Sequence, residues 1–292
     1  MTDRENAQLR GQVRKYVLKQ EHRYPGGHRV DSTFSPEGHL LEKRQRNADG
    51  SEWSVICRYD DSGRIVERQQ HGKPSELISY RYDSLGRLLS VTARSAYGDE
   101  HVRESYQYDA AGRKTRIVHP PPIPAGANVG IAIDCMFEFS PEASSIVTLF
   151  DEQDRPSMRI FYDPNNNADR VVLLRHDAHG RLVEEGEREP DGTIARDRNR
   201  IYIYDDNGQP IEITTHHSLG TFRKTFAYNE HGDLSRERQE HRLIVDDTED
   251  WTSHYLYQYD DRGNWTERTT EVETSDGARR VNLIERRQLD YY

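Results

Sequence analysis

Short runs of alternating apolar and polar residues follow one another along this chain, separated by polar turn residues. In Ile131–Phe139 every odd-numbered position is apolar, which is typical of a strand with one buried face. The legs between turn signals are about 7–10 residues long, so each spans roughly 25–33 Å as a strand. The pattern therefore predicts an all-β chain of consecutive antiparallel strands.

One turn motif, clearest in the heptapeptide Tyr82–Leu88 (YDSLGRL), repeats along the chain. With this heptapeptide there are nine copies, some degenerate, mostly at intervals of about 23–31 residues, a period that indicates a repeat array. The other copies begin at Phe34, Tyr59, Tyr108, Phe150, His176, Tyr204, Tyr228 and Tyr259. We therefore expect a tandem array of similar structural units.

Each motif position has a physical role in a β-hairpin. An Asp that opens a type I turn accepts hydrogen bonds from the turn amides, and a Gly three residues later adopts the positive φ that returns the chain to its partner strand. The aromatic residue before the Asp and the apolar residue after the turn then form a cross-strand pair. The predicted turn residues are Tyr59, Asp60, Gly63, Tyr82, Asp83, Gly86, Tyr108, Asp109, Gly112, Asp177, Gly180, Tyr204, Asp205, Gly208, Tyr228, Gly232, Tyr259, Asp260 and Gly263.

A second set of turn signals lies between successive copies of the motif, so the chain can fold back each time. This set comprises Asp49-Gly50, Gly72-Lys73-Pro74, Gly98-Asp99, Asp191-Gly192, Leu219-Gly220 and Asp276-Gly277. The two sets together predict tandem hairpins in one continuous, curved antiparallel sheet, either an open arc or a partial shell or barrel.

The repeated Y-D-x-x-G-R-L signature resembles that of the YD-repeat, or Rhs, family of bacterial Rhs proteins, toxin-complex shell proteins and teneurins. The resemblance covers roughly residues 34 to 268 and is closest at Tyr82–Leu88, with good matches from Tyr59, Tyr108 and His176. It implies hairpins side by side in a sheet that winds into a shell, and a role as a capsule for toxic cargo or as an adhesion or carbohydrate-contacting module.

Two properties of that family do not carry over to this chain. Bacterial relatives end their core in a self-cleavage sequence of the type D-P-x-G-x, whereas the one Asp-Pro here, Asp163-Pro164, is followed by three Asn residues. We also expect no toxin domain after Tyr292. The resemblance therefore predicts neither self-cleavage nor a resident toxin.

The repeat array divides the chain into three predicted parts. Residues 1–33 form a lead-in, residues 34–268 the array, and residues 269–292 a C-terminal strand or cap. Two alternatives stand for the lead-in: a helix capped by Thr2 and Glu5, or a strand over Gln12–His22 that turns into a second strand before Phe34.

The array is interrupted once, over residues 117–150. Its proline run from His119 to Gly126 cannot donate ladder hydrogen bonds, and we expect an extended loop or a proline-rich partner ligand there. Downstream, Phe139-Ser140, Phe150-Asp151 and Tyr162-Asp163 all resemble motif copies. They cannot all lie on one side of the sheet, so at least one must be a bulge or a turn on the opposite side.

Composition narrows the class of protein. Only 33% of the residues are hydrophobic, but 17 Tyr residues add large contact area, so we expect a folded, polar β-structure with a thin core. A net charge of −10, with acidic and basic residues interspersed, argues against nucleic-acid binding. Two cysteines, Cys57 and Cys135, are expected to be free thiols.

The sequence shows no targeting or membrane-spanning segment. The first 15 residues lack the apolar core of a signal peptide, and there is no apolar run near 18 residues. We expect a cytoplasmic protein as synthesised, or one exported without a cleaved leader, with no membrane insertion.

No catalytic, cofactor or metal motif is recognisable. The pair His216-His217 would point to opposite faces of a strand, and Asp246–Asp250 lacks the spacing of a calcium loop. The sequon Asn264-Trp265-Thr266 is treated as chance. The sequence therefore predicts no cofactor and no enzyme, although an enzyme without a local motif is a third alternative.

Two binding roles follow from the predicted sheet. About 18 strands closed without tilt would give a diameter of only about 27 Å, too narrow for a folded domain. An open arc would expose edge strands, so a protein partner or self-association is expected, and we predict a non-catalytic scaffold. A carbohydrate-binding or adhesion module is the alternative, with Trp53, Trp251 and Trp265 as candidate stacking residues.

Overall fold

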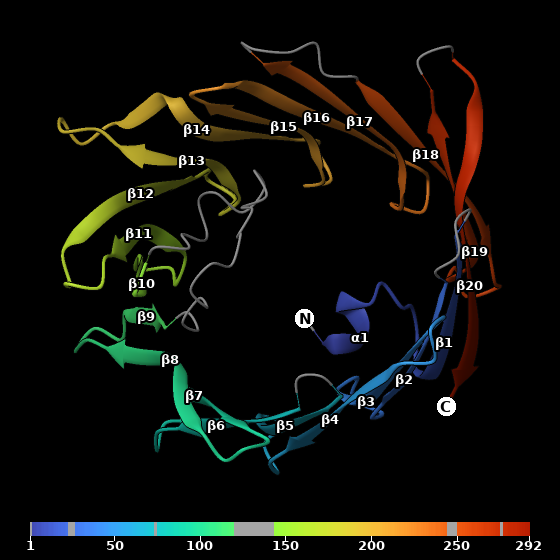
Figure 1. Cartoon of the computed structure of the whole chain (residues 1–292), viewed down its shortest axis with the longest axis horizontal. Helices are drawn as coiled ribbons and strands as arrows, with labels where there is room; N and C mark the ends of the chain where they lie inside the picture. Colours follow the sequence, from blue (N-terminus) through green and yellow to red (C-terminus); the bar gives the residue numbers. More distant parts are fainter. Residues whose placement is uncertain (1, 23–26, 73–74, 120–142, 244–249, 275–276) are drawn as a thin grey trace.

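The computed structural model describes all residues except 1, 23–26, 73–74, 120–142, 244–249 and 275–276 (Figure 1). It contains one single-turn helix, α1 (Asp3–Asn6), and a 20-stranded sheet. The strands are β1 (Val13–His22), β2 (His28–Phe34), β3 (Leu40–Asn47), β4 (Glu52–Tyr59), β5 (Ile65–His71), β6 (Glu76–Tyr82), β7 (Leu88–Ser95), β8 (Glu100–Tyr108), β9 (Lys114–Val118), β10 (Ser145–Phe150), β11 (Pro156–Tyr162), β12 (Ala168–His176), β13 (Leu182–Arg188), β14 (Ile194–Tyr204), β15 (Pro210–His217), β16 (Gly220–Tyr228), β17 (Leu234–Leu243), β18 (Trp251–Tyr259), β19 (Trp265–Glu273) and β20 (Arg279–Tyr291).

The sheet closes on itself. Each strand pairs antiparallel with the strands before and after it in the chain, β9 pairs with β10 across the interruption, and β1 pairs with β20 from Val13 to His22. The ribbon forms a ring, and α1 lies inside it (Figure 1). The predicted continuous antiparallel sheet is confirmed, in its closed form rather than as an open arc.

The turns fall on two rims because successive strands run in opposite directions. The motif turns share one edge of the ring, which we call the YD rim, and the second set of turns shares the other, which we call the distal rim. Asp151 opens a turn between β10 and β11 on the YD rim, whereas Asp163 opens one between β11 and β12 on the distal rim. The expectation that one of these motif-like copies turns on the opposite side is met by Asp163.

The lead-in follows the strand alternative. The helix ends at Asn6, and the chain continues as β1 and β2, which pair with each other. The sheet therefore includes strands from all three predicted parts of the chain. The expected strand Ile131–Phe139, the proline run after His119, Cys135 and the motif-like Phe139 lie outside the described residues.

The core is thin, as the composition indicates. One apolar cluster joins Ile146, Phe161, Val172 and Leu174 from β10, β11 and β12. The other joins Leu9, Val13 and Phe34 where the N-terminal segment meets β1 and β2. Cys57 is a buried free thiol. Among the described residues, no helix is long and apolar enough to cross a membrane.

Candidate functional site

The turns of the YD rim are held by one repeated set of hydrogen bonds. In the turn after β6, the Asp83 carboxylate accepts bonds from the backbone amides of Leu85 (3.0 Å) and Arg87 (2.8 Å) and from Arg87 Nε (2.7 Å). These bonds, that from the Arg87 amide foremost, lower the pKa of Asp83. Gly86 has a φ of 80°, the left-handed conformation that the turn requires.

Neighbouring hairpins are tied together by the motif tyrosines. The Tyr82 hydroxyl donates to the backbone carbonyl of Ile65 in the preceding hairpin at 2.8 Å. The Arg64 guanidinium lies 4.9 Å from the Tyr82 ring centroid, and Arg87 lies 4.3 Å from that of Tyr108. The Tyr, Asp and Arg of this copy thus all bond or stack within the sheet, so the motif has a structural role.

The motif tyrosines face the interior of the ring. Asp3 of α1, inside the ring, accepts hydrogen bonds from the Tyr59 hydroxyl (3.2 Å) and the Leu40 amide (2.8 Å). Alternation along the strands then assigns the other residues to the inner or outer wall. The inner wall is therefore accessible to polypeptide, because the chain's own N-terminal segment contacts it.

Buried ion pairs cross the inner wall. Glu185 on β13 is 1% exposed and pairs with Arg159 at 3.0 Å and Arg200 at 3.4 Å. The Tyr202 hydroxyl donates to Glu185 at 2.6 Å, and burial together with that carboxylate raises the pKa of Tyr202. These groups satisfy one another, which explains how so polar a chain can line its interior.

Four aromatic rings form a row on the inner wall near the distal rim. His217, Phe222, His241 and Trp251 come from the consecutive strands β15 to β18, with ring centroids 5.0, 4.6 and 5.3 Å apart in that order. Burial lowers the pKa of His217, and its Nδ1 accepts a bond from the Leu219 amide. Trp251 remains 41% exposed, so this part of the wall offers aromatic surface to the interior.

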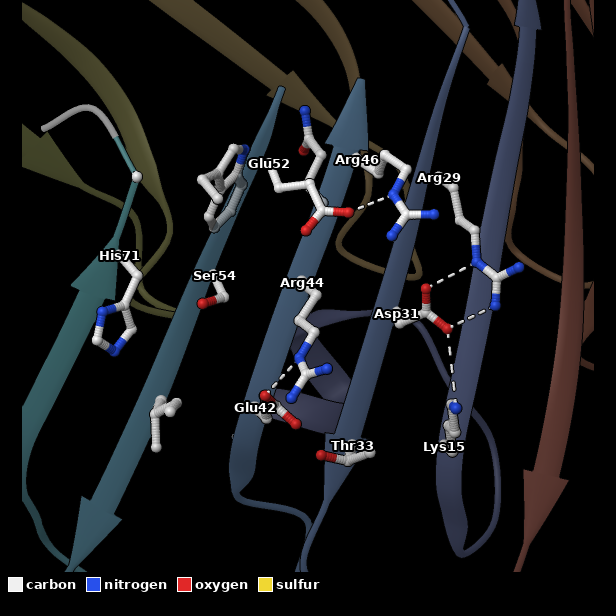
Figure 2. A pocket seen from close by; sticks show the side chains of 14 residues that line it. Lys15, Arg29, Asp31, Thr33, Glu42, Arg44, Arg46, Glu52, Ser54 and His71 are labelled. Atoms are coloured by element: carbon white, nitrogen blue, oxygen red, sulfur yellow. Dashed lines mark hydrogen bonds and ion pairs between the residues drawn. The ribbon is translucent and has the colours of Figure 1, made fainter. Parts of the chain in front are cut away.

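The outer wall carries a groove over β1 to β5 (Figure 2). It has a volume of about 710 Å³, within the range of ligand sites. Arg29 donates to both oxygens of Asp31 at 2.8 and 2.9 Å, and Arg44 donates to Glu42 at 2.6 Å. The lining residues are Lys15, Arg29, Asp31, Thr33, Glu42, Arg44, Gln45, Arg46, Glu52, Trp53, Ser54, Ile56, His71 and Gly72.

The groove offers paired charges instead of an assembled catalytic group. It holds the hydroxyls of Thr33 and Ser54 and the imidazole of His71, but no hydrogen bond among the described residues joins His71 to either hydroxyl. No group of three metal-ligating side chains occurs in the described part of the chain.

The residues singled out from the sequence do not come together. Trp53 lies on β4, Trp251 begins β18 at the distal rim, and Trp265 begins β19 near the YD rim, where it is 3% exposed. His216 bonds Thr221 while His217 stacks on Phe222. The predicted stacking residues therefore form no common aromatic cluster.

Two further sequence candidates are engaged in the fold. Asp250 pairs with Arg242 at 3.0 Å, while residues 246–249 lie outside the described part. Asn264 of the sequon is 1% exposed and bonds the backbone of Arg10, which makes it a structural residue.

The sequence of this chain is similar to part of a bacterial toxin. It is 36% identical over 80 residues to "Toxin protein Tse5" of Pseudomonas aeruginosa, a match that covers 27% of this chain and 6% of that protein. The chain thus matches only a small part of the length of that relative. No family model matches the chain.

Solved structures give more distant likenesses. A TcdB2-TccC3-Cdc42 structure is 12% identical with a TM-score of 0.38, covering 87% of this chain and 15% of that one. A porin-like protein from Bacteroides uniformis is 9% identical with a TM-score of 0.41, covering 96% of this chain and 99% of that one. The 80-residue match thus relates part of this chain to a protein named as a toxin.

Proposed function

We propose that this chain is a non-catalytic shell scaffold that holds a polypeptide partner against the inner wall of its closed sheet. The observation that carries the proposal is the N-terminal segment, residues 3–12, which binds that wall inside the ring. Arg10 contacts the YD rim at His231 and Asp233, and Leu9 is 5% exposed in an apolar cluster. The wall therefore offers the kinds of contact that a second polypeptide needs.

The size of the ring favours a polypeptide segment as the occupant. Twenty strands spaced about 4.8 Å apart give a backbone diameter of about 31 Å without tilt, and about 37–43 Å at ordinary strand tilts. A folded domain of about 100 residues has a radius of gyration near 13 Å, hence a diameter of about 34 Å, and no longer fits once the inward side chains are counted. A helix about 10–12 Å wide fits beside the N-terminal segment.

The inner wall also has the chemistry for this role. The aromatic row at the distal rim supplies contact area, and buried ion pairs such as Glu185–Arg200 keep the strands in register without exposing lone charges. The similarity to a protein named as a toxin adds support for a toxin-associated role. Because the sheet is closed, it has no exposed edge strands to which a protein partner could bind. The proposal therefore depends on the inner wall alone.

Photo-crosslinking from two positions on β18 tests this proposal. A photoreactive phenylalanine replaces either Trp251, which faces inward and is 41% exposed, or Leu256, which faces outward and is 53% exposed. In the cells that make the protein, we expect a defined polypeptide adduct from position 251 and none from position 256. Adducts only from position 256, or from neither position, would contradict enclosure.

A further inference from the structure

A guanidinium on the inner wall lacks an anion. Arg287 on β20 stacks on Trp265 of β19, with its Cζ 3.5 Å from the ring centroid. Nε and Nη1 of Arg287 and the indole Nε1 of Trp265 are buried and have no hydrogen-bond partner. Arg287 Nη2 makes one long bond, 3.4 Å, to the carbonyl of Ala7. Three buried donors on two adjacent side chains are thus unsatisfied.

The local charge count leaves one positive charge uncompensated. Glu285 pairs with Arg268, which lies on the same indole at 5.2 Å, and Asp233 pairs with Arg10 at 3.8 Å. No carboxylate pairs with Arg287 in the part of the chain that is described. Burial lowers the pKa of Arg287 to about 10, as expected for a cation removed from water without a counter-ion. Such a charge is costly unless an anion or water reaches it.

Other arginines of the chain show how this one would bind. Arg29 donates through Nε and Nη2 to the two oxygens of Asp31, at 2.8 and 2.9 Å. Arg116 does the same to Glu104, at 2.9 and 2.7 Å. On Arg287, Nε is unpaired and Nη2 is held only by Ala7. A carboxylate that displaced the Ala7 carbonyl would receive the same two parallel bonds.

We propose that Arg287 and Trp265 form a binding site for a carboxylate, covered by the N-terminal segment. This segment is anchored on either side of Ala7, by Asp3 on the Leu40 amide and by Arg10 at the YD rim. Lifting it at Ala7 breaks the long bond to Arg287 and removes the Ala7 side chain from the apolar cluster of Leu9, Val13 and Phe34. The carboxylate comes either from a free anion or from an Asp or Glu side chain of a polypeptide in the interior. The inference stands apart from the proposed function, because a free anion can bind without a partner.

Trp265 fluorescence tests the site directly. In a Trp53→Phe, Trp251→Phe background, acetate is titrated against chloride at constant ionic strength. We expect a saturable change in emission that Arg287→Gln weakens about tenfold or more, since bonds to a charged donor are lost. The matched control Arg262→Gln, which removes a cation 3.9 Å from the Tyr291 ring, leaves the titration unchanged. Circular dichroism checks that each variant is folded.

A variant that loosens the N-terminal segment gives a second test of the site. Leu9→Ala weakens the apolar anchor of the N-terminal segment, so acetate is expected to bind more tightly. A short peptide containing Glu, compared with its Gln twin, separates the two sources: preference for the Glu peptide over acetate indicates a side chain, and equal binding indicates a free anion. The proposed site is refuted if neither the parent nor the Leu9→Ala protein shows a saturable change in emission. It is also refuted if the change persists in the Arg287→Gln variant. Crosslinking from position 251 is independent of this result.

Discussion

The joint that closes the ring gives the sharpest test of how the sheet is stabilised. Glu285 on β20 is 2% exposed and bonds Arg268 on β19 and Gln20 on β1, the latter at 2.7 Å. It therefore connects the closing strand to both neighbours. Glu285→Gln keeps the shape but leaves the Arg268 cation without its partner.

The expected loss follows from burial. Breaking a fully buried pair costs about 3–5 kcal/mol, and because the Arg268 side chain is 28% exposed we expect about 2–4 kcal/mol. Glu267→Gln is the matched control, since Glu267 joins the same two strands on the outer wall through Arg286, 47% exposed, and we expect a clearly smaller loss. Urea denaturation followed by circular dichroism measures both variants.

A double variant isolates the interaction itself. Glu285→Gln combined with Arg268→Gln removes both charges of the pair. We therefore expect the double variant to lose less stability than the sum of the two single variants, by about 0.5–3 kcal/mol. The reasoning fails if Glu285→Gln destabilises the protein no more than Glu267→Gln, or if the double variant shows strict additivity.

Three further predictions concern the turns, a tight strand contact and pH. Tyr82→Phe removes the bond to Ile65 and should cost about 1 kcal/mol in urea denaturation, whereas Tyr97→Phe, at a residue 95% exposed, should cost nothing. Gly186→Ala places a Cβ 2.6 Å from Ile194 Cγ2 and 2.7 Å from the Arg198 carbonyl, so its Tm should fall; an unchanged Tm would refute close packing there. Burial and the Asp233 carboxylate raise the pKa of Tyr259 to about 12, so its contribution to stability is complete below pH 10 and is lost as pH rises from 10 through 12. Tyr259→Phe should flatten that part of the plot of unfolding free energy against pH. An unchanged slope would contradict this role of Tyr259.

The strands and turns could be read from the sequence because their causes are local. Asp83 and Gly86 act within one turn, and Tyr82 reaches only the preceding hairpin. Closure of the sheet could not be predicted from the sequence, because the pairing strands β1 and β20 lie almost the whole length of the chain apart. The Arg287–Trp265 stack could not be predicted for a related reason. Most motif turns end in a bulge, such as that between Gln258 and Tyr259, which changes the alternation that assigns residues to a wall.

Closure changes what the repeats can do. An open array of hairpins has two unpaired edge strands that must be covered, but here the edges satisfy each other along β1 and β20. A closed ring can therefore leave its inner wall polar, because stability comes from complete backbone pairing and from buried pairs such as Glu285–Arg268. A wall that needs no apolar filling is consistent with the polypeptide partner that we propose, and the contacts of Asp3 and Arg10 show that the chain's own N-terminal segment binds there.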